Sequence, residues 1–366
     1  MSRVPVLPHE LVVEILSWLP VKALMRFRCV SKTWNSLIFD PTLVKLHLQR
    51  SLKNTHILLR FLTTSKGGRE LKIYVGAATC SIPRLLENPS STIDDCVQRF
   101  KRTSFLFGAC NGLVSFLESF VWVEFGEYKV RFWNPATRIM SRYSPRLRLD
   151  SSNYKIKPYS LRCGFGFDDW SDTYKVVVVL LDVKSQTREV RVHCLGDTCW
   201  RKTLTCPEFP MLGRLYGQFA GGTLNWLALC SSSSDYEWRT VAIHQLVIFS
   251  YDLRNDTFRN LLMPEGLLEV PLVEPNLGTL KGCLCLSHVH EGTHFVVWLM
   301  REFGVEKSWT QLVKVSYEHL QSHALPSFTM VPLCMSQDED VLLLEDYDGG
   351  GLVLYNRRDD RMDHTE

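Results

Sequence analysis

The sequence predicts a small all-α domain of three helices, followed by an all-β domain built from repeated short strands. Apolar residues recur at helical spacing before residue 46, and short strand-like runs fill the rest of the 366-residue chain. A turn motif also recurs five times along the strand-rich part. Repeats of about fifty residues with four strands per unit are typical of a β-propeller, so we expect about six blades.

The first predicted helix begins near Pro8 and ends at Pro20. Proline suits the first turn of a helix, where the N–H group that it lacks would have no partner. Leu11, Ile15 and Leu19 recur every four residues, so they lie on one wide apolar stripe.

Two further helices are expected before residue 46. The second is outlined by Ala23, Phe27 and Val30. Ser31 suits the N-cap of the third, because its hydroxyl can accept a hydrogen bond from a free backbone N–H group. The apolar residues of that helix are Trp34, Leu37 and Ile38. Three short helices in about forty residues cannot bury a full core alone, so the segment needs a partner.

These residues resemble the F-box, in particular its plant form. The resemblance runs from residue 4 to 45 and rests on the ordered segments 7–11, 14–16, 19–22 and 27–34. Trp18 and Ala23 depart from it, since an Arg and a Ser are common there, which puts contact details in doubt.

The F-box resemblance implies binding to a Skp-type adaptor, which links the chain to a cullin ubiquitin ligase. The motif positions expected at the adaptor are Leu7, Pro8, Leu11, Ile15, Leu16, Leu19, Pro20, Val21 and Leu24. We expect Trp18 on the exposed or adaptor-facing side of its helix. The alternative is an ordinary helical fragment that packs on the rest of the chain.

The character of the sequence changes after the polar stretch 49–55. We expect an F-box at 1–46, a linker at 47–55, a β domain at 56–356 and a polar tail at 357–366. Examples of the predicted strands are 112–117, 174–181, 189–193, 222–228 and 247–252, and Ser231 to Ser234 reads as a flexible loop. No long helical pattern interrupts them, which argues against a parallel α/β sheet.

Each copy of the turn motif contains a strand end, a polar turn and one large apolar residue. Those apolar residues are Ile139, Trp200, Phe258, Trp309 and Met362, at steps of 61, 58, 51 and 53 residues. Glycine-containing turns at 111–113, 222–224 and 281–283 begin strands in three units. With the strands between Ile57 and Phe107, the copies indicate a closed, kelch-like ring. A two-sheet sandwich with accidental periodicity is the alternative.

The β domain is similar to the F-box-associated region of plant F-box/kelch-repeat proteins. The segments that carry this resemblance are 110–113, 133–138, 164–168, 174–177, 282–286, 297–298, 304–309 and 342–346. It implies a protein-binding domain that selects substrates for ubiquitination, with no shared catalytic residues. The recognition surface of that family varies, so the substrate-binding residues of this chain stay unknown.

One short motif suggests a metal site. His290-Glu291-Gly292-Thr293-His294 fits the HExxH pattern, in which two histidines on one helical face bind zinc. Gly292 is a poor helix residue, and the flanking runs read as paired strands, so we expect a hairpin turn. Cys283 and Cys285 suit a core role better than a zinc site. We therefore expect no metal, cofactor or catalytic residue.

A basic run lies between Lys129 and Lys157, with eight Lys or Arg residues against one acid, Asp150. Trp133, Tyr143 and Tyr154 are interleaved with it. Such a run could bind RNA or an acidic or phosphorylated segment. A solvated long loop between blades is the simpler interpretation.

Charge and cysteine usage limit the functional classes. The chain has 42 Lys and Arg against 39 Asp and Glu, a net charge of +3, which indicates no general affinity for nucleic acid or membranes. Its twelve cysteines lack framework spacing, which suits a reducing compartment. The N-terminal residues do not read as a signal peptide, and the longest apolar run, 176–181, is too short to span a bilayer. We expect a protein of the cytoplasm, the nucleus or both.

Together these features predict a non-catalytic substrate-recognition subunit of an SCF-type cullin ubiquitin ligase. Its partners would be the Skp-type adaptor and an unknown target protein, with no nucleic acid and no membrane. A ligase-independent binding scaffold is one alternative. A propeller-type hydrolase is another, although the sequence shows no converging carboxylates.

Overall fold

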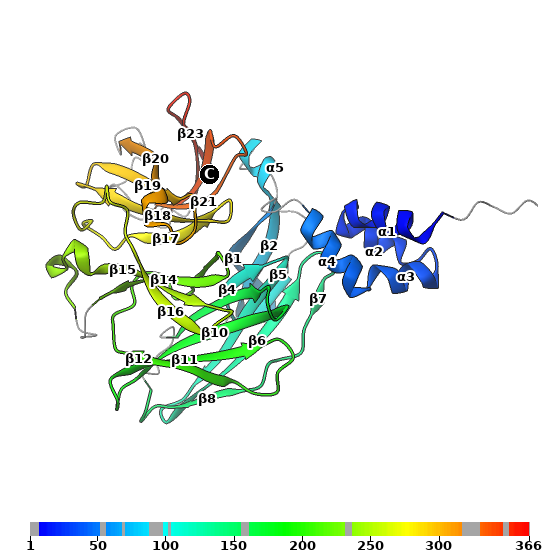
Figure 1. The fold of residues 1–366 in the computed structure, drawn as a ribbon, viewed down its shortest axis with the longest axis horizontal. Coiled ribbons are helices and arrows are strands. Elements are labelled where there is room, and N and C mark those ends of the chain that lie inside the picture. Colours follow the sequence, from blue (N-terminus) through cyan, green and yellow to red (C-terminus); the bar gives the residue numbers. More distant parts are fainter. Residues whose placement is uncertain are drawn as a thin grey trace, which may run out of the picture.

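The computed structural model describes residues 7–51, 56–67, 70–87, 98–101, 104–154, 161–230, 236–316, 330–346 and 351–365. Helices come first, and six antiparallel sheets follow in chain order (Figure 1). The helices project from one side of the ring of sheets (Figure 1). The predicted fold, an N-terminal helical domain followed by a six-bladed propeller, is confirmed.

The helical domain contains four helices rather than three. They are α1 (His9–Trp18), α2 (Val21–Phe27), α3 (Lys32–Ile38) and α4 (Pro41–Arg50). Ser31 caps α3 as predicted, because its hydroxyl accepts a hydrogen bond from the Trp34 N–H at 3.1 Å. The linker expected from residue 47 is wrong at its start, because α4 continues to Arg50.

The first three sheets, or blades, come from residues 56–207. Blade 1 comprises β1 (His56–Gly67), β2 (Glu70–Ser81) and β3 (Gln98–Lys101), with α5 (Ile82–Glu87) after β2. Blade 2 comprises β4 (Ser104–Cys110), β5 (Leu113–Val121), β6 (Phe125–Asn134), β7 (Ile139–Met140) and β8 (Leu147–Asp150). Blade 3 comprises β9 (Arg162–Asp168), β10 (Thr173–Asp182), β11 (Thr187–Cys194) and β12 (Arg201–Pro207).

The last three blades come from residues 218–365. Blade 4 comprises β13 (Gln218–Ala220), β14 (Thr223–Leu229), β15 (Leu246–Asp252) and β16 (Thr257–Leu262). Blade 5 comprises β17 (Asn276–Leu280), β18 (Cys283–His290), β19 (His294–Met300) and β20 (Trp309–Ser316). Blade 6 comprises β21 (Met330–Met335), β22 (Val341–Asp346), β23 (Gly351–Asn356) and β24 (Arg361–Thr365). The polar tail expected at 357–366 is therefore wrong, because β24 pairs with β23 along its whole length.

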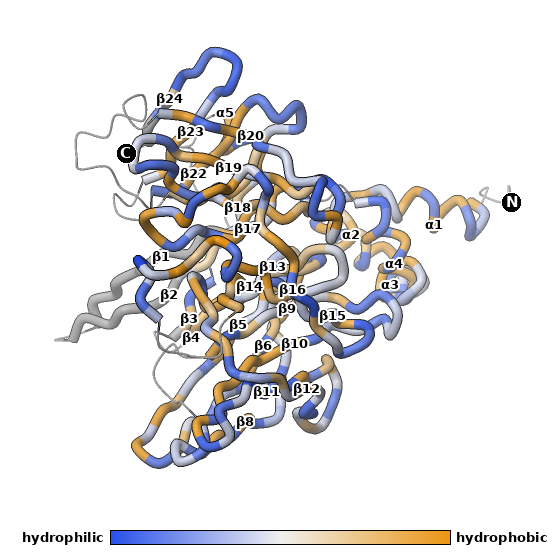
Figure 2. Tube along the Cα trace, turned by 60° about the vertical axis from the view of Figure 1, so that its left-hand side comes forward, coloured by the Kyte–Doolittle hydropathy of each residue, from blue (hydrophilic) through white to orange (hydrophobic). Residues whose placement is uncertain are grey.

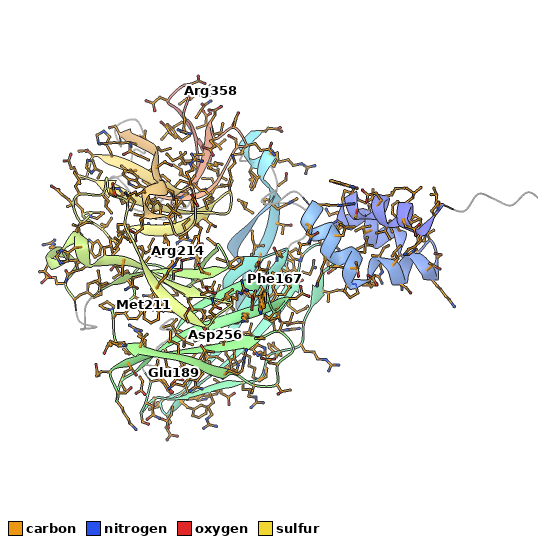
Figure 3. All side chains as sticks on the ribbon, viewed as in Figure 1. Phe167, Glu189, Met211, Arg214, Asp256 and Arg358 are labelled. Atoms are coloured by element: carbon orange, nitrogen blue, oxygen red, sulfur yellow. The ribbon has the colours of Figure 1, made fainter. Side chains whose placement is uncertain are left out.

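The repeated turns account for the sequence period. All five copies of the turn motif join the third and fourth strands of blades 2 to 6, and Asp256 and Arg358 mark two of these turns (Figure 3). In blade 4 the Tyr251 hydroxyl donates to the Asp256 carboxylate, and in blade 6 Tyr355 donates to Asp360, both at 3.0 Å. The same side-chain contact thus fixes the same turn in two blades.

The glycine-containing turns join the first and second strands of blades 2, 4 and 5. Asn111 and Gly112 have φ angles of 48° and 76°, the left-handed conformation that a two-residue hairpin of type I′ requires. The turns at 221–222 and 281–282 also have positive φ at both residues. These hairpins set the register of the innermost strands. The Ser231 to Ser234 loop lies outside the described residues.

The two faces of the ring carry different connections. Because the strands are antiparallel, the turns after the first and third strands of each blade lie on one face. The longer connections 208–217 and 263–275, with the described residues 236–245, lie on the opposite face, which we call the long-loop face. Lys45 of α4 contacts Asp172, in the β9–β10 turn, at 2.6 Å, so the helical domain lies opposite the long loops.

Side-chain contacts bind the long loops to one another. The Arg162 guanidinium donates to the carbonyl oxygens of Met211, labelled in Figure 3, and Gly213, at 2.6 and 2.8 Å. The Glu274 carboxylate accepts from the Gly213 N–H and from the Tyr236 hydroxyl, at 2.9 and 2.7 Å. The long-loop face is thus held in a fixed shape over blades 3 to 5.

Apolar packing closes the ring between blade 6 and blade 1. Each sheet consists of consecutive strands, so no described strand is shared between the two blades. Their common core is made by Cys80, Ile82 and Leu85 of blade 1 and by Cys334, Leu343 and Leu354 of blade 6. Helix α5 takes part, because it contacts both β21 and β22.

Two glycines explain the Gly-Phe-Gly-Phe-Asp segment of β9. A Cβ atom on Gly164 would lie 2.8 Å from a Leu224 methyl carbon of blade 4. A Cβ atom on Gly166 would overlap Phe219 and Leu253. Only glycine lets blades 3 and 4 approach this closely.

A buried ion pair lies beside the same seam. The Lys175 ammonium is 2.9 Å from the Asp168 carboxylate and also donates to the Leu253 carbonyl of blade 4. Burial opposes ionisation of Asp168, but hydrogen bonds from Ser171 and Lys175 outweigh it and lower its pKa. The pair therefore ties blade 3 to blade 4 in the ionised state.

We predict that Leu343→Ala destabilises the closed propeller more than a substitution of an exposed leucine does. Leu343 is fully buried between blades 6 and 1, so truncation should lower the free energy of unfolding by about 2–5 kcal/mol. Urea titration followed by tryptophan fluorescence measures this, with the exposed Leu272→Ala as the control. Equal losses in both variants would mean that closure does not depend on this contact.

The Asp168–Lys175 pair predicts acid sensitivity. A carboxylate whose pKa is lowered by folding stabilises the fold above its unfolded pKa, near 3.8, and this contribution disappears as the pH falls through the folded value. Asp168→Asn should cost about 3–5 kcal/mol at neutral pH, because Lys175 stays buried without its carboxylate. Asp168→Asn combined with Lys175→Met should recover part of that loss and show a weaker pH dependence below 3.8 in urea titrations. An unchanged acid profile in the double variant would contradict this role.

Candidate functional site

The core of the helical domain is formed by four residues, one from each helix. They are Leu16, Leu24, Ile38 and Leu43. Leu16 is completely buried and Leu24 nearly so, although both are expected among the adaptor contacts, which stays a prediction. The reason is α4, which the sequence interpretation missed and which packs against α1. The signal for it was present, because Asp40 and Pro41 form an N-cap followed by proline at the first helical position.

A row of apolar side chains remains exposed along α1. Leu7, Leu11, Ile15 and Trp18 are 55%, 49%, 50% and 64% exposed, and we call these four residues the α1 stripe. Hydrophobic stretches recur along this helix in Figure 2. Large exposed apolar groups on so small a domain indicate an interaction surface.

The other expected contact positions lie near the α1 stripe in the sequence and differ in exposure. Pro8 and Pro20 are exposed, whereas Leu19 and Val21 are half-buried. The structure thus leaves Leu7, Pro8, Leu11, Ile15 and Pro20 accessible among the nine positions. Trp18, where the sequence departs from the usual motif, lies on the exposed side and extends the stripe by one helical turn.

Arg50 at the end of α4 holds the C-terminal turn of α1. Its guanidinium lies 2.8 Å from the Glu14 carboxylate, donates to the Ser17 hydroxyl and stacks 5.0 Å from the centre of the Trp18 ring. The Trp18 indole N–H donates to Glu14 at 3.1 Å. Hydrogen bonds from Arg50 and then Trp18 lower the pKa of Glu14. These contacts fix the orientation of Trp18.

The Lys45–Asp172 ion pair connects the helical domain to the propeller through exposed groups. Both side chains are more than half exposed, and such pairs contribute little to stability. Trp170 of the same turn is also exposed and lies under the Arg254 guanidinium at 4.1 Å.

Comparison with known families identifies both parts of the chain. Residues 4–49 match the F-box-like family model, and residues 73–360 match the F-box associated beta propeller domain. The chain belongs to the F-box proteins with an associated propeller. Both predicted resemblances are confirmed.

Curated relatives match nearly the whole length of this chain. The Arabidopsis thaliana F-box/kelch-repeat protein At3g23880 is 31% identical, and the match covers 96% of this chain and 87% of the relative. The F-box protein CPR1 of the same plant is 27% identical, with 93% and 79% covered. The F-box protein At4g22390 is also 27% identical, with 95% and 83% covered.

The HExxH segment of this F-box protein forms a hairpin, as the sequence predicts. His290 of β18 pairs with His294 of β19, so the two histidines are not on a helix. Burial lowers the pKa of the neighbouring His288 to about 4, and its imidazole accepts from the Trp298 indole N–H. Among the described residues, no three His, Cys, Asp or Glu side chains are grouped to hold a metal ion. No helix in the described part of the chain is long and apolar enough to cross a membrane.

Of the eight basic residues in the run, three lie on strands. Lys129 and Arg131 lie on β6 and Arg148 lies on β8, which pairs with β6. The expected long loop between blades is therefore wrong for these parts of the run. Its last segment, 155–160, lies outside the described residues.

We predict that Arg50→Ala loosens α1, while Lys45→Ala does not. Arg50 contacts Glu14, Ser17 and Trp18, so its removal should cost the helical domain about 1–2 kcal/mol, whereas an exposed ion pair contributes less. Hydrogen exchange of the α1 amides measures the difference, with faster exchange expected only in Arg50→Ala. Equal exchange in both variants would mean that α4 does not hold α1.

Proposed function

We propose that this protein is the substrate-recognition subunit of an SCF-type cullin ubiquitin ligase, working in the cytoplasm, the nucleus or both. The observation that carries the proposal is the α1 stripe, exposed on an F-box domain that is joined to a propeller. An F-box domain with surplus exposed apolar surface is suited to a partner protein. The Skp-type adaptor is the partner that the F-box family implies.

The proposed adaptor surface follows from exposure. Leu7, Leu11 and Ile15 offer side chains that a partner can bury, and Pro8 and Pro20 flank them. Trp18 adds a large ring that Arg50 holds in place. Leu16 and Leu24 support this surface from inside, and Leu19 and Val21 are proposed to contribute at its edge.

The propeller is proposed to hold the target protein. Its long-loop face lies opposite the F-box, so an adaptor on α1 and a target on these loops would not compete for space. The cross-linked loops at 208–217 and 263–275 present a fixed shape, which lowers the entropic cost of binding. The proposed role is non-catalytic. The protein raises the effective concentration of target lysines near the ubiquitin carrier.

We predict that Leu11→Asp combined with Ile15→Asp abolishes adaptor binding. Each side chain is about half exposed, and each should contribute about 2 kcal/mol as a hot spot, so the affinity should fall by two orders of magnitude or more. Isothermal titration with a purified plant Skp-type adaptor measures the loss.

The matched control is Leu268→Asp combined with Leu272→Asp, which alters two exposed propeller leucines. This variant should bind the adaptor normally, and circular dichroism should show both variants folded. Undiminished binding by the folded α1 variant would refute the proposed docking surface.

A further inference from the structure

One sheet face of blade 2 carries aromatic rings and cations that the described part of the protein leaves half-buried or exposed. We call Phe120, Trp122, Phe125, Tyr143, Lys129, Arg131 and Arg148 the blade 2 patch. Phe120 belongs to β5, Phe125, Lys129 and Arg131 to β6, and Arg148 to β8. The alternate residues of β6, Tyr128 and Val130, face blade 3 and are buried. Three basic residues of the run therefore lie on one face of a folded sheet.

Blade 1 covers only part of this face. Phe100 of β3 stacks on Phe116 of β5 with ring centres 3.9 Å apart. Trp122, in the turn after β5, remains 49% exposed, and Tyr143, between β7 and β8, remains 43% exposed. The turn that carries Trp122 follows the second strand of its blade, so it belongs to the long-loop face.

The rings hold the cations in position. The Arg148 guanidinium lies 3.9 Å from the centre of the Phe125 ring, and Arg131 lies 4.5 Å from that of Tyr143. Lys129 lies 5.8 and 5.9 Å from the rings of Phe120 and Tyr143. Cation–ring contacts of this kind restrict long side chains before a partner arrives, so less entropy is lost on binding.

The charged ends are only partly occupied, because the Arg131 Nε–H donates to the Ser141 carbonyl at 3.0 Å. The described residues include no ion pair of Lys129, Arg131 or Arg148, whereas the neighbouring Arg146 lies 3.8 Å from Glu127. The nearby Glu118 carboxylate accepts from the Tyr143 hydroxyl at 2.8 Å. The patch therefore offers ammonium and guanidinium groups, interspersed with carboxylates, next to exposed aromatic surface.

We propose that the blade 2 patch binds an acidic peptide segment that also carries an aromatic or apolar side chain. Glu118, Glu127 and Asp150 lie on the same face, and such interspersed acids disfavour a continuous phosphate backbone. Trp, Tyr and Arg are the residues that dominate protein–protein hot spots. The assignment of this segment to the ligase target rests on the proposed function. The chemistry of the peptide that the patch would bind does not depend on it.

The position of the patch is compatible with simultaneous adaptor binding. Strand β8 lies at the bottom of the propeller in Figure 1, away from the helices α1 to α4. The patch is thus accessible to an extended segment of a target protein that the same propeller holds. Binding of that segment should weaken with salt, because it depends on charged groups at the surface.

The test uses the full chain and a short fluorescein-labelled peptide rich in Asp and Glu with one central Phe. Fluorescence anisotropy should show saturable binding that falls at least about tenfold in Arg131→Gln with Arg148→Gln, and about fivefold in Trp122→Ala. The charge-matched control is Lys184→Gln with Lys307→Gln, on blades 3 and 5. Trp170→Ala is the aromatic control, because Trp170 is also exposed and lies under an arginine. Both controls should retain wild-type affinity.

Three results would overturn the proposal. They are no saturable peptide binding at millimolar concentration, equal losses in patch and control variants, and equal competition by a single-stranded RNA of the same charge. The same variants are also titrated with the Skp-type adaptor. If the adaptor fails to bind while the peptide follows the patch, the ligase role fails and the patch remains.

Discussion

The propeller depends on the apolar contact between its last blade and its first. Each sheet is made of consecutive strands, so within the described residues no strand crosses from blade 6 into blade 1 to close the ring by backbone hydrogen bonds. Leu343 and Leu354 meet Ile82 and Leu85 instead. An open ring would expose strand edges, which invites association with other chains. The fixed arrangement of the long-loop face and of the blade 2 patch follows from this closure.

The helical domain is under a different constraint, because it is too small to cover its own apolar residues. Leu16 and Leu24 fill the core that four short helices can build, while Leu11, Ile15 and Trp18 remain outside it. The exposed Lys45–Asp172 pair contributes little to holding the two parts together. The surface that cannot be buried internally is thus the surface proposed for the adaptor. Of the α1 residues, Leu16 stabilises the folded domain, whereas Leu11, Ile15 and Trp18 belong to the proposed binding surface.

Local signals made much of the fold predictable. Glycine turns such as Asn111-Gly112 set hairpins, and the recurrent polar turns marked the blades. What the sequence did not reveal depends on contacts between distant segments. The burial of Leu16 depends on α4, and the tail proved to be a strand because β23 offers it a partner. The blade 2 patch requires Arg148 of β8 to pair beside β6 across a connection that runs past Tyr143. Only the Asp40–Pro41 signal for α4 was available locally.

The proposed function requires that the F-box and the propeller are separate modules with separate partners. The most direct measurement compares the full chain with a chain lacking residues 1–51, by circular dichroism, thermal unfolding and titration with the Skp-type adaptor. The account predicts that the shortened chain keeps its β spectrum, unfolds cooperatively and does not bind the adaptor, whereas the full chain binds it with one-to-one stoichiometry. An unfolded shortened chain, or one that still binds the adaptor, would contradict the account.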